Sequence, residues 1–293
     1  MMHKVWFLPA VLFLFSLWAT GVAFGAKTGG SRSEKAILLV AFGTTVADAQ
    51  KPFETIEART RAAFPGVEIR WAFTSSTVRA KMAEQGKPVD SPEMALARLM
   101  NDGYPRVAVL SLHVVPGQEF HDLRHNASLF AEMSGGIETV AVARPLLSST
   151  EDMRRVAKAV LARIPETRKA EDGVLFMGHG NKNHPSDAIY GAMNGLLQDL
   201  SSNVHMGTVE GYPSIDDLLP KLKGVKKVYL MPFMAVAGRH AQNDMAGDGP
   251  ESWKSILTKN GFNCEVVLTG LTEYPEVVEV WLDHLKEAVA KLQ

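Results

Sequence analysis

Apolar runs that end in glycine-containing turns are the feature that most constrains how this chain folds. Residues 36–42 form one such run before Gly43, and residues 173–177 form another before Gly178. Runs of this kind are typical of strands buried on both faces of a parallel sheet. Segments with helical periodicity separate the runs, so the pattern predicts an α/β fold whose parallel sheets are covered by helices on both faces.

The second half of the chain repeats the pattern of the first. Residues 107–117 align with residues 228–238 without a gap, at a constant offset of 121, and Phe42-Gly43-Thr44 aligns with Met177-Gly178-His179. Chance resemblance between apolar strands is the alternative. The shared order of elements favours an internal duplication of one α/β unit.

The duplication predicts two Rossmann-like lobes. We expect an N-terminal lobe at residues 26–146 and a C-terminal lobe at 147–293, with a last helix at 275–292 that packs on either lobe. Ligands of open α/β sheets bind at the carboxyl ends of the strands. The predicted binding site is therefore the cleft between the lobes.

Local signals predict where the elements begin and end. Ser149 and Ser214 each precede a helical segment and are expected N-caps, with Asp217 at the N3 position of the second helix. The equivalent apolar strands of the two repeats are predicted to span residues 107–115 and 227–233.

Composition and charge exclude several classes of protein. Hydrophobic residues make up 46% of the chain and charged residues 22%, which is typical of a packed globular protein and not of a disordered one. The formal net charge of −1 gives no global positive field, so nucleic acid is not an expected partner. The only cysteine, Cys264, is expected in a buried strand, and no intramolecular disulfide is possible.

The first 25 residues have the features of a secretory signal peptide. Lys4 precedes an apolar run of about 14 residues, and Ala23-Phe24-Gly25 provides the small-x-small pattern for cleavage. The run is shorter than the ~20 residues that span a bilayer, which favours cleavage over the alternative of an uncleaved anchor. We expect a periplasmic protein without a stable membrane anchor.

Three residues at strand ends of the second lobe form a candidate metal site. His179 lies in Met-Gly-His-Gly, Glu210 in Val-Glu-Gly and His240 in Ala-Gly-Arg-His. Two imidazoles and a carboxylate suit a borderline divalent metal such as iron, cobalt, nickel or zinc. Ordinary surface or turn residues are the alternative for each residue alone. Their shared location at the carboxyl ends of three strands is what favours a site.

Other chemistries lack their motifs. Neither Gly-x-Gly-x-x-Gly nor Gly-x-x-x-x-Gly-Lys-Ser/Thr occurs at the strand-to-helix turns, which disfavours a nucleotide site. The chain also lacks a Gly-x-Ser-x-Gly elbow, which disfavours a covalent hydrolase.

Three longer motifs carry a resemblance to a known family. They are Met-Gly-His-Gly-Asn-Lys-Asn-His at 177–184, Val-Glu-Gly-Tyr-Pro at 209–213, and the segment at 231–248 that contains Ala-Gly-Arg-His-Ala-Gln-Asn-Asp. Together they resemble the anaerobic sirohydrochlorin cobaltochelatases, class II chelatases related in fold to ferrochelatase. The resemblance covers essentially the whole mature chain and implies a bilobal α/β protein that inserts Co²⁺ into sirohydrochlorin without ATP.

The resemblance also implies roles for individual residues. In the family, two histidines and a glutamate of the C-terminal lobe hold the metal, and these correspond to His179, His240 and Glu210 here. Few protein ligands leave coordination positions open for the pyrrole nitrogens. Imidazole, with a reference pKa of ~6.5, can act as both ligand and proton acceptor. We assign His179 as principal base and ligand, His240 as second ligand and Glu210 as anchoring ligand.

Sirohydrochlorin carries eight carboxylates, so a nearly neutral chain must meet them with local cations. Candidates near strand ends are Lys182 and Arg239, together with Arg79 and Lys81, and His113 is a further candidate for facing the cleft. The alternative is that these cations are only solvated. An aliphatic lip is expected to line the faces of the macrocycle, although a strand-core role is the alternative for most of its members: Val114, Val115, Met234 and Val236.

A second histidine group follows the strand-end turn of the first lobe. If this segment is helical, His121 and His125 lie one turn apart on one face, a spacing that can share a metal or present an axial ligand to haem. Two exposed helix histidines are the alternative. We hypothesise an auxiliary haem or metal site at His121.

Two functions remain open at this point. The first is a chelatase that uses cobalt, with iron or nickel as alternatives because a His/His/Glu site discriminates weakly by affinity. The second is an exported protein that binds and transfers a tetrapyrrole or a metal without turnover, an alternative that the signal peptide supports. The expected partners are sirohydrochlorin and further copies of the same chain in a homo-oligomer.

Overall fold

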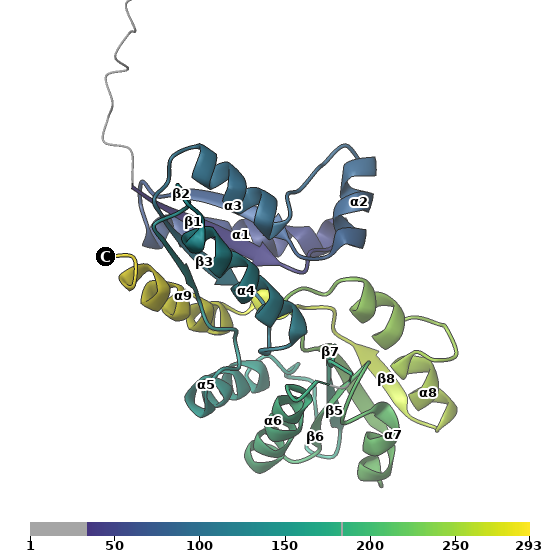
Figure 1. Cartoon of the computed structure of the whole chain (residues 1–293). Coiled ribbons are helices and arrows are strands. Elements are labelled where there is room, and N and C mark those ends of the chain that lie inside the picture. Colours follow the sequence, from purple (N-terminus) through teal and green to yellow (C-terminus); the bar gives the residue numbers. More distant parts are fainter. Residues whose placement is uncertain (1–33, 183) are drawn as a thin grey trace, which may run out of the picture. The chain divides into compact units, whose positions relative to one another are not determined.

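A computed structural model describes residues 34–182 and 184–293, and the predicted signal peptide lies outside these residues. The described chain contains two four-stranded parallel sheets (Figure 1). The first has the order β2-β1-β3-β4 and the second the order β6-β5-β7-β8. The strands are β1 Lys35–Ala41, β2 Glu68–Phe73, β3 Arg106–Ser111, β4 Thr139–Val142, β5 Gly173–Gly178, β6 Val204–Thr208, β7 Lys227–Pro232 and β8 Asn263–Val266.

The two sheets have the same topology, which confirms the predicted α/β class. In the first sheet β1 lies between β2 and β3, and in the second sheet β5 lies between β6 and β7. β3 and β7 occupy equivalent places and differ by the offset of 121 found in the sequence. The identical strand order, together with the shared offset of β3 and β7, supports an internal duplication.

Helices cover the sheets and connect their strands. Ser149 caps α5 and Ser214 caps α7, as predicted, and Asp217 completes a capping box with Ser214 at the start of α7. The helices are α1 Ala47–Ala63, α2 Ser76–Glu84, α3 Pro92–Asn101, α4 Gln118–Glu132, α5 Thr150–Leu161, α6 Asp187–Leu200, α7 Ile215–Leu218, α8 Trp253–Lys259 and α9 Pro275–Ala290, with short 3₁₀ turns at Leu219–Leu222 and Leu271–Glu273 and a π-helical turn at Ala241–Met245. In the described part of the chain, no helix is long and apolar enough to cross a membrane.

Alternation along β1 places its side chains in two different cores. Ile37 and Leu39 join a large cluster that also contains Phe176 of β5, whereas Leu38 and Val40 pack on the opposite face of the sheet. Successive side chains of a strand point to opposite faces, so an uninterrupted apolar run fills both. The large cluster is shared by both sheets and joins the two lobes.

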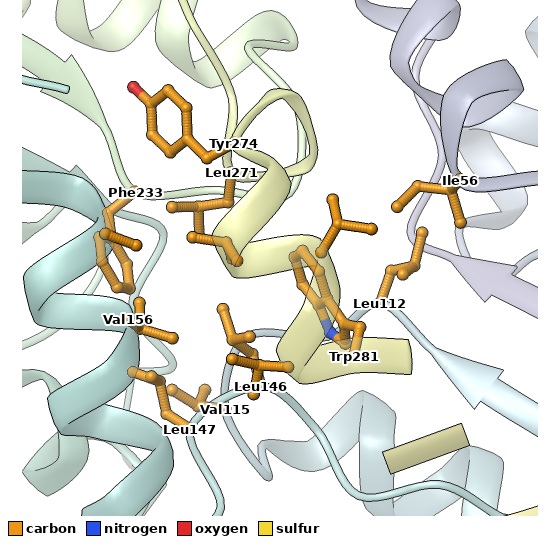
Figure 2. Packing of buried hydrophobic residues seen from close by; sticks show 14 of the residues in the cluster. Ile56, Leu112, Val115, Leu146, Leu147, Val156, Phe233, Leu271, Tyr274 and Trp281 are labelled. Carbon is orange, nitrogen blue, oxygen red and sulfur yellow. The ribbon is translucent and has the colours of Figure 1, made fainter. Parts of the chain in front are cut away.

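Helix α9 closes this shared cluster. It comes from the end of the chain and packs against β3 and β4 of the first sheet and against α5 (Figure 1). Trp281 of α9 is fully buried and belongs to one cluster with Leu112 and Ile56 of the first lobe and Phe233 and Val156 of the second half (Figure 2).

Two details of the sequence predictions are wrong. The strand expected at 107–115 ends at Ser111, because the segment beyond it leaves the sheet and forms the loop that enters α4. Cys264 lies in β8 as a strand residue, but it is only half-buried, since β8 is an edge strand. Burial still raises the pKa of its thiol, so the thiol stays protonated at neutral pH.

Candidate active site

A cavity of about 540 Å³ opens at the carboxyl ends of strands from both sheets. The turns after β1 and β3 form one wall, and the turns after β5, β6 and β7 form the other. His179, Glu210 and His240 all line this cavity, as do Lys182, Arg239 and His113. The topology therefore brings together residues that lie far apart along the chain.

The two predicted histidines form a close pair. The ring centroids of His179 and His240 are 4.5 Å apart, and the ring planes are nearly perpendicular at 88°. The Nδ1 atom of His179 lies 2.9 Å from the carbonyl oxygen of Gly180, which can only accept a hydrogen bond. Nδ1 must therefore carry the proton, and Nε2 carries the lone pair that can bind a metal.

Asp244 gives His240 the same tautomer. The His240 Nδ1 lies 2.6 Å from an oxygen of the Asp244 carboxylate, so Nδ1–H donates and Nε2 again carries the lone pair that can bind a metal. Sequence reasoning included Asp244 in a motif but gave it no role. The four-residue spacing to His240 is the signal that could have found it, because such residues face each other on a helical turn.

Glu210 is held next to His179 through its backbone. Its N–H donates to the carbonyl of His179 at 2.8 Å, and its side chain is exposed at the cavity. Across residues 34–182 and 184–293, no three His, Cys, Asp or Glu side chains are grouped closely enough to hold a metal ion. The structure thus pairs the histidines and leaves the Glu210 carboxylate outside that pair.

The opposite wall carries a second polar network. The Nδ1 atom of His113 is hydrogen-bonded to Ser111 Oγ at 2.7 Å, and its Nε2 atom lies 3.4 Å from the carboxylate of Glu119. Glu119 also accepts a hydrogen bond of 2.6 Å from the hydroxyl of Thr74. Burial acts to raise the pKa of Glu119, but these hydrogen bonds, and the positive charges that His113 and His179 carry when protonated, lower it below its usual value. Glu119 is therefore ionised at neutral pH.

Sequence reasoning missed Glu119, although the duplication contained the signal. At the offset of 121, Glu119 is equivalent to His240, and Thr44 is equivalent to His179 through the alignment of the first turns. All four residues line the same cavity. The two walls are thus equivalent in backbone and different in chemistry, with imidazoles on one and a hydroxyl and a carboxylate on the other.

Most of the predicted cationic and apolar residues line the cavity, and one does not. Lys81, Lys182 and Arg239 line the cavity, whereas Arg79 does not, because its guanidinium donates to the carbonyls of Phe73 and Thr74 at 2.6 Å. Arg79 is therefore a structural residue at the end of β2, and its assignment to the cleft was wrong. The predicted aliphatic lip does line the cavity, with all four members present: Val114, Val115, Met234 and Val236.

The second histidine group lies outside the cavity. The segment is helical, which meets the condition set for this group, but the ring nearest to His121 is that of His184 from the other lobe, with centroids 5.7 Å apart. His121 is half-buried and His125 is exposed. Neither His121 nor His184 lines the cavity that contains His179.

The fold is shared with sirohydrochlorin chelatases of known structure. Among solved structures, the sirohydrochlorin chelatase SirB from Bacillus subtilis subspecies spizizenii in complex with cobalt superposes with a TM-score of 0.62 at 17% identity, covering 88% of this chain and 96% of that one. CbiX, described as the terminal enzyme for biosynthesis of siroheme in denitrifying bacteria, superposes with a TM-score of 0.56 at 19% identity, covering 86% of this chain and 99% of that one. At these identities the likeness establishes the fold.

Sequence comparison establishes the family. Residues 35–290 match the cobalt chelatase (CbiK) family, and the chain belongs to it. It is 43% identical over 262 residues to sirohydrochlorin cobaltochelatase CbiKC of Nitratidesulfovibrio vulgaris, covering 89% of this chain and 92% of that protein. It is 34% identical over 260 residues to the sirohydrochlorin cobaltochelatase of Salmonella typhimurium, covering 87% of this chain and 97% of that protein.

Proposed function

We propose that the protein inserts Co²⁺ into sirohydrochlorin without ATP. The observation that carries this proposal is the pair of perpendicular imidazoles, His179 and His240, whose Nε2 lone pairs are both available in one cavity. The volume of about 540 Å³ lies within the range of pockets that hold small molecules and cofactors. Membership in the cobalt chelatase family supports the choice of reaction.

The reaction must transfer the ion from protein to ring and remove two pyrrole protons. His179 and His240 bind the ion through Nε2, and two imidazoles leave coordination positions open for ring nitrogens. As each ring nitrogen replaces an imidazole, that imidazole regains a lone pair within reach of a pyrrole N–H. It can then accept the proton, since neutral imidazole is a suitable base near neutral pH.

Two carboxylates contribute to this step in different ways. The Glu210 side chain is exposed beside His179, and rotation about its side-chain bonds would let it serve as a third ligand. Glu119 is a weak base because its pKa is lowered, so we assign it to electrostatic attraction of the cation across the cavity. Lys81, Lys182 and Arg239 provide the cations for the substrate carboxylates.

Multiple-turnover insertion tests the proposal. The chain from residue 26 onward is incubated with sirohydrochlorin and Co²⁺, and spectral conversion beyond one equivalent is expected. His179→Ala and His240→Ala should each abolish conversion while the fold is retained, and His125→Ala, which removes an exposed imidazole outside the cavity, is the matched control. Full conversion in either site variant would contradict the assignment. Conversion that stops at one equivalent would favour the binding-and-transfer function.

The same assay resolves the metal and the substrate contacts. Iron and nickel are alternative substrates, because an imidazole pair discriminates weakly among these ions, and rates with Fe²⁺ and Ni²⁺ measure the preference. Replacing Lys182 or Arg239 with alanine should raise the KM for sirohydrochlorin and leave the KM for Co²⁺ unchanged. An unchanged KM for sirohydrochlorin in both variants would remove these residues from the substrate site.

Export is a separate proposal. We infer a periplasmic protein from the apolar run at residues 5–18 and the cleavage pattern at 23–25, and the family match begins only at residue 35. Cell fractionation with N-terminal sequencing tests this inference. A protein found in the cytoplasm with an intact N-terminus would contradict it.

The auxiliary haem site at His121 also remains a proposal. His121 is half-buried on α4, and Leu129 of the same helix and Met133, its C-cap residue, are exposed, which favours contact with a further copy of the chain. Haem titration should produce a Soret band that is lost in His121→Ala and kept in His125→Ala. Light scattering tests the homo-oligomer. A spectrum unchanged by haem would contradict the haem site, and a monomer would contradict the assembly.

A further inference from the structure

The two imidazoles of the site are held by chemically different partners. His179 donates its Nδ1–H to the neutral backbone carbonyl of Gly180 at 2.9 Å, whereas His240 donates to the carboxylate of Asp244 at 2.6 Å. A hydrogen bond to an anionic acceptor is shorter and stronger than one to a neutral acceptor. It also increases the electron density of the imidazole and its strength as a metal donor.

Local backbone geometry creates this contact. His240 precedes the π-helical turn Ala241–Met245, in which the N–H of Ala246 donates to the carbonyl of Ala241 at 3.1 Å. Isolated π turns occur frequently at functional sites. Here the turn places a side chain four residues after His240 against its ring, on the side opposite to the ligating Nε2.

We propose that Asp244 is a positioning residue for the metal ion. It fixes His240 with Nε2 toward the cavity and makes His240 the stronger of the two imidazole donors. The ion is then held chiefly by His240, and His179 is the ligand that yields to the ring nitrogens first. This inference rests on the proposed metal-binding role of the pair and reverses the ranking expected from the sequence, in which His179 was the principal ligand.

Two substitutions separate the contributions of Asp244. In Asp244→Asn the amide oxygen can still accept from Nδ1–H, so the tautomer is kept and only the negative charge is lost. Asp244→Ala removes both the hydrogen-bond acceptor that fixes the tautomer and the negative charge. Since partners of this kind change metal affinity by about 10–100-fold, we expect the Kd for Co²⁺ to rise by that factor in Asp244→Ala and by less in Asp244→Asn.

Asp248→Asn is the matched control. It makes the same chemical change four residues along, at an exposed carboxylate that pairs with Lys254 and does not line the cavity. The Kd is measured by Co²⁺ titration in the absence of sirohydrochlorin, from the visible absorption of bound Co²⁺. A fold defect would change thermal unfolding and the KM for sirohydrochlorin as well. The proposal predicts that only Co²⁺ binding and the KM for Co²⁺ change.

A double-variant comparison tests whether Asp244 acts through His240. In the His240→Ala background, Asp244→Ala should cause no further loss of affinity for Co²⁺. In the His179→Ala background, it should cause the same loss of affinity as it does in the wild-type protein. His240→Ala should also raise the Kd more than His179→Ala. An unchanged Kd in Asp244→Ala, or a loss that persists without His240, would overturn the proposal. Because binding is measured without the macrocycle, a protein that binds Co²⁺ but never inserts it would refute only the proposed function.

Discussion

Replacing Gly180 with alanine tests whether the turn after β5 sets the geometry of the site. Gly180 has a φ of +83°, in the left-handed region, and a Cβ built on it lies 2.5 Å from the carbonyl oxygen of Glu210 and 2.9 Å from the Cβ of Thr208. Neither neighbour is the flexible end of a long side chain. The contact can be relieved only if the backbone of the β5 or β6 turn moves.

The magnitude follows from two separate costs. A left-handed conformation costs a non-glycine residue about 1–2 kcal/mol, and overpacking against a rigid neighbour costs about 1–3 kcal/mol. We therefore expect Gly180→Ala to lower the free energy of unfolding by about 2–5 kcal/mol. Glu210 N–H donates to the carbonyl of His179, so the same displacement shifts the imidazole. A misplacement of about 1 Å can lower a rate by about 100-fold, and we expect a loss of insertion rate approaching that size.

Gly224→Ala is the matched control. Gly224 has a φ of +86°, and nothing lies within 4 Å of a Cβ built there, so this variant pays only the conformational cost. Urea unfolding and cobalt insertion are measured for both variants. If Gly180→Ala is no less stable than Gly224→Ala and inserts cobalt at the wild-type rate, the argument that this turn fixes His179 is refuted.

Three further predictions concern the shared core, the buried Asp152 and the start of α7. Trp281→Ala should lower the free energy of unfolding by about 3–5 kcal/mol because it empties a fully buried site. Trp281→Phe should cost much less, since the indole N–H has no hydrogen-bond partner among the described residues. Urea unfolding of both variants checks this prediction, and equal losses would contradict it. Asp152→Asn should destabilise most at neutral pH. Burial acts to raise the pKa of Asp152, but the Ser149 hydrogen bond and the charges of His284 and Arg144 lower it, so its stabilisation is present above the unfolded pKa and is lost as pH falls through the folded one. Unfolding free energies of wild type and variant should therefore converge below a pH of about 4, and a constant difference would contradict the linkage. Ser214→Ala should cost about 1 kcal/mol through loss of the capping box, and no change in the urea midpoint would count against that role.

Local sequence signals were sufficient for the repeated architecture. Uninterrupted apolar runs predicted strands buried on both faces, and β1 places alternate side chains in two cores as that pattern requires. The predicted caps at Ser149 and Ser214 are confirmed, because a cap depends only on residues three positions apart. The end of β3 was misplaced, since the apolar residues beyond Ser111 line the cavity and do not continue the ladder.

The sequence by itself determined the repeat, the order of the elements and the residue types at each strand end, because apolar periodicity and turn chemistry are local properties. Only the tertiary structure decided which of those residues meet. It paired His179 with His240, placed Asp244 behind one ring and Glu119 on the facing wall, and turned Arg79 away to the backbone. The physical reason is that these relations depend on how two sheets and α9 pack around one core, and on side-chain hydrogen bonds of fixed direction that spacing along the chain does not encode.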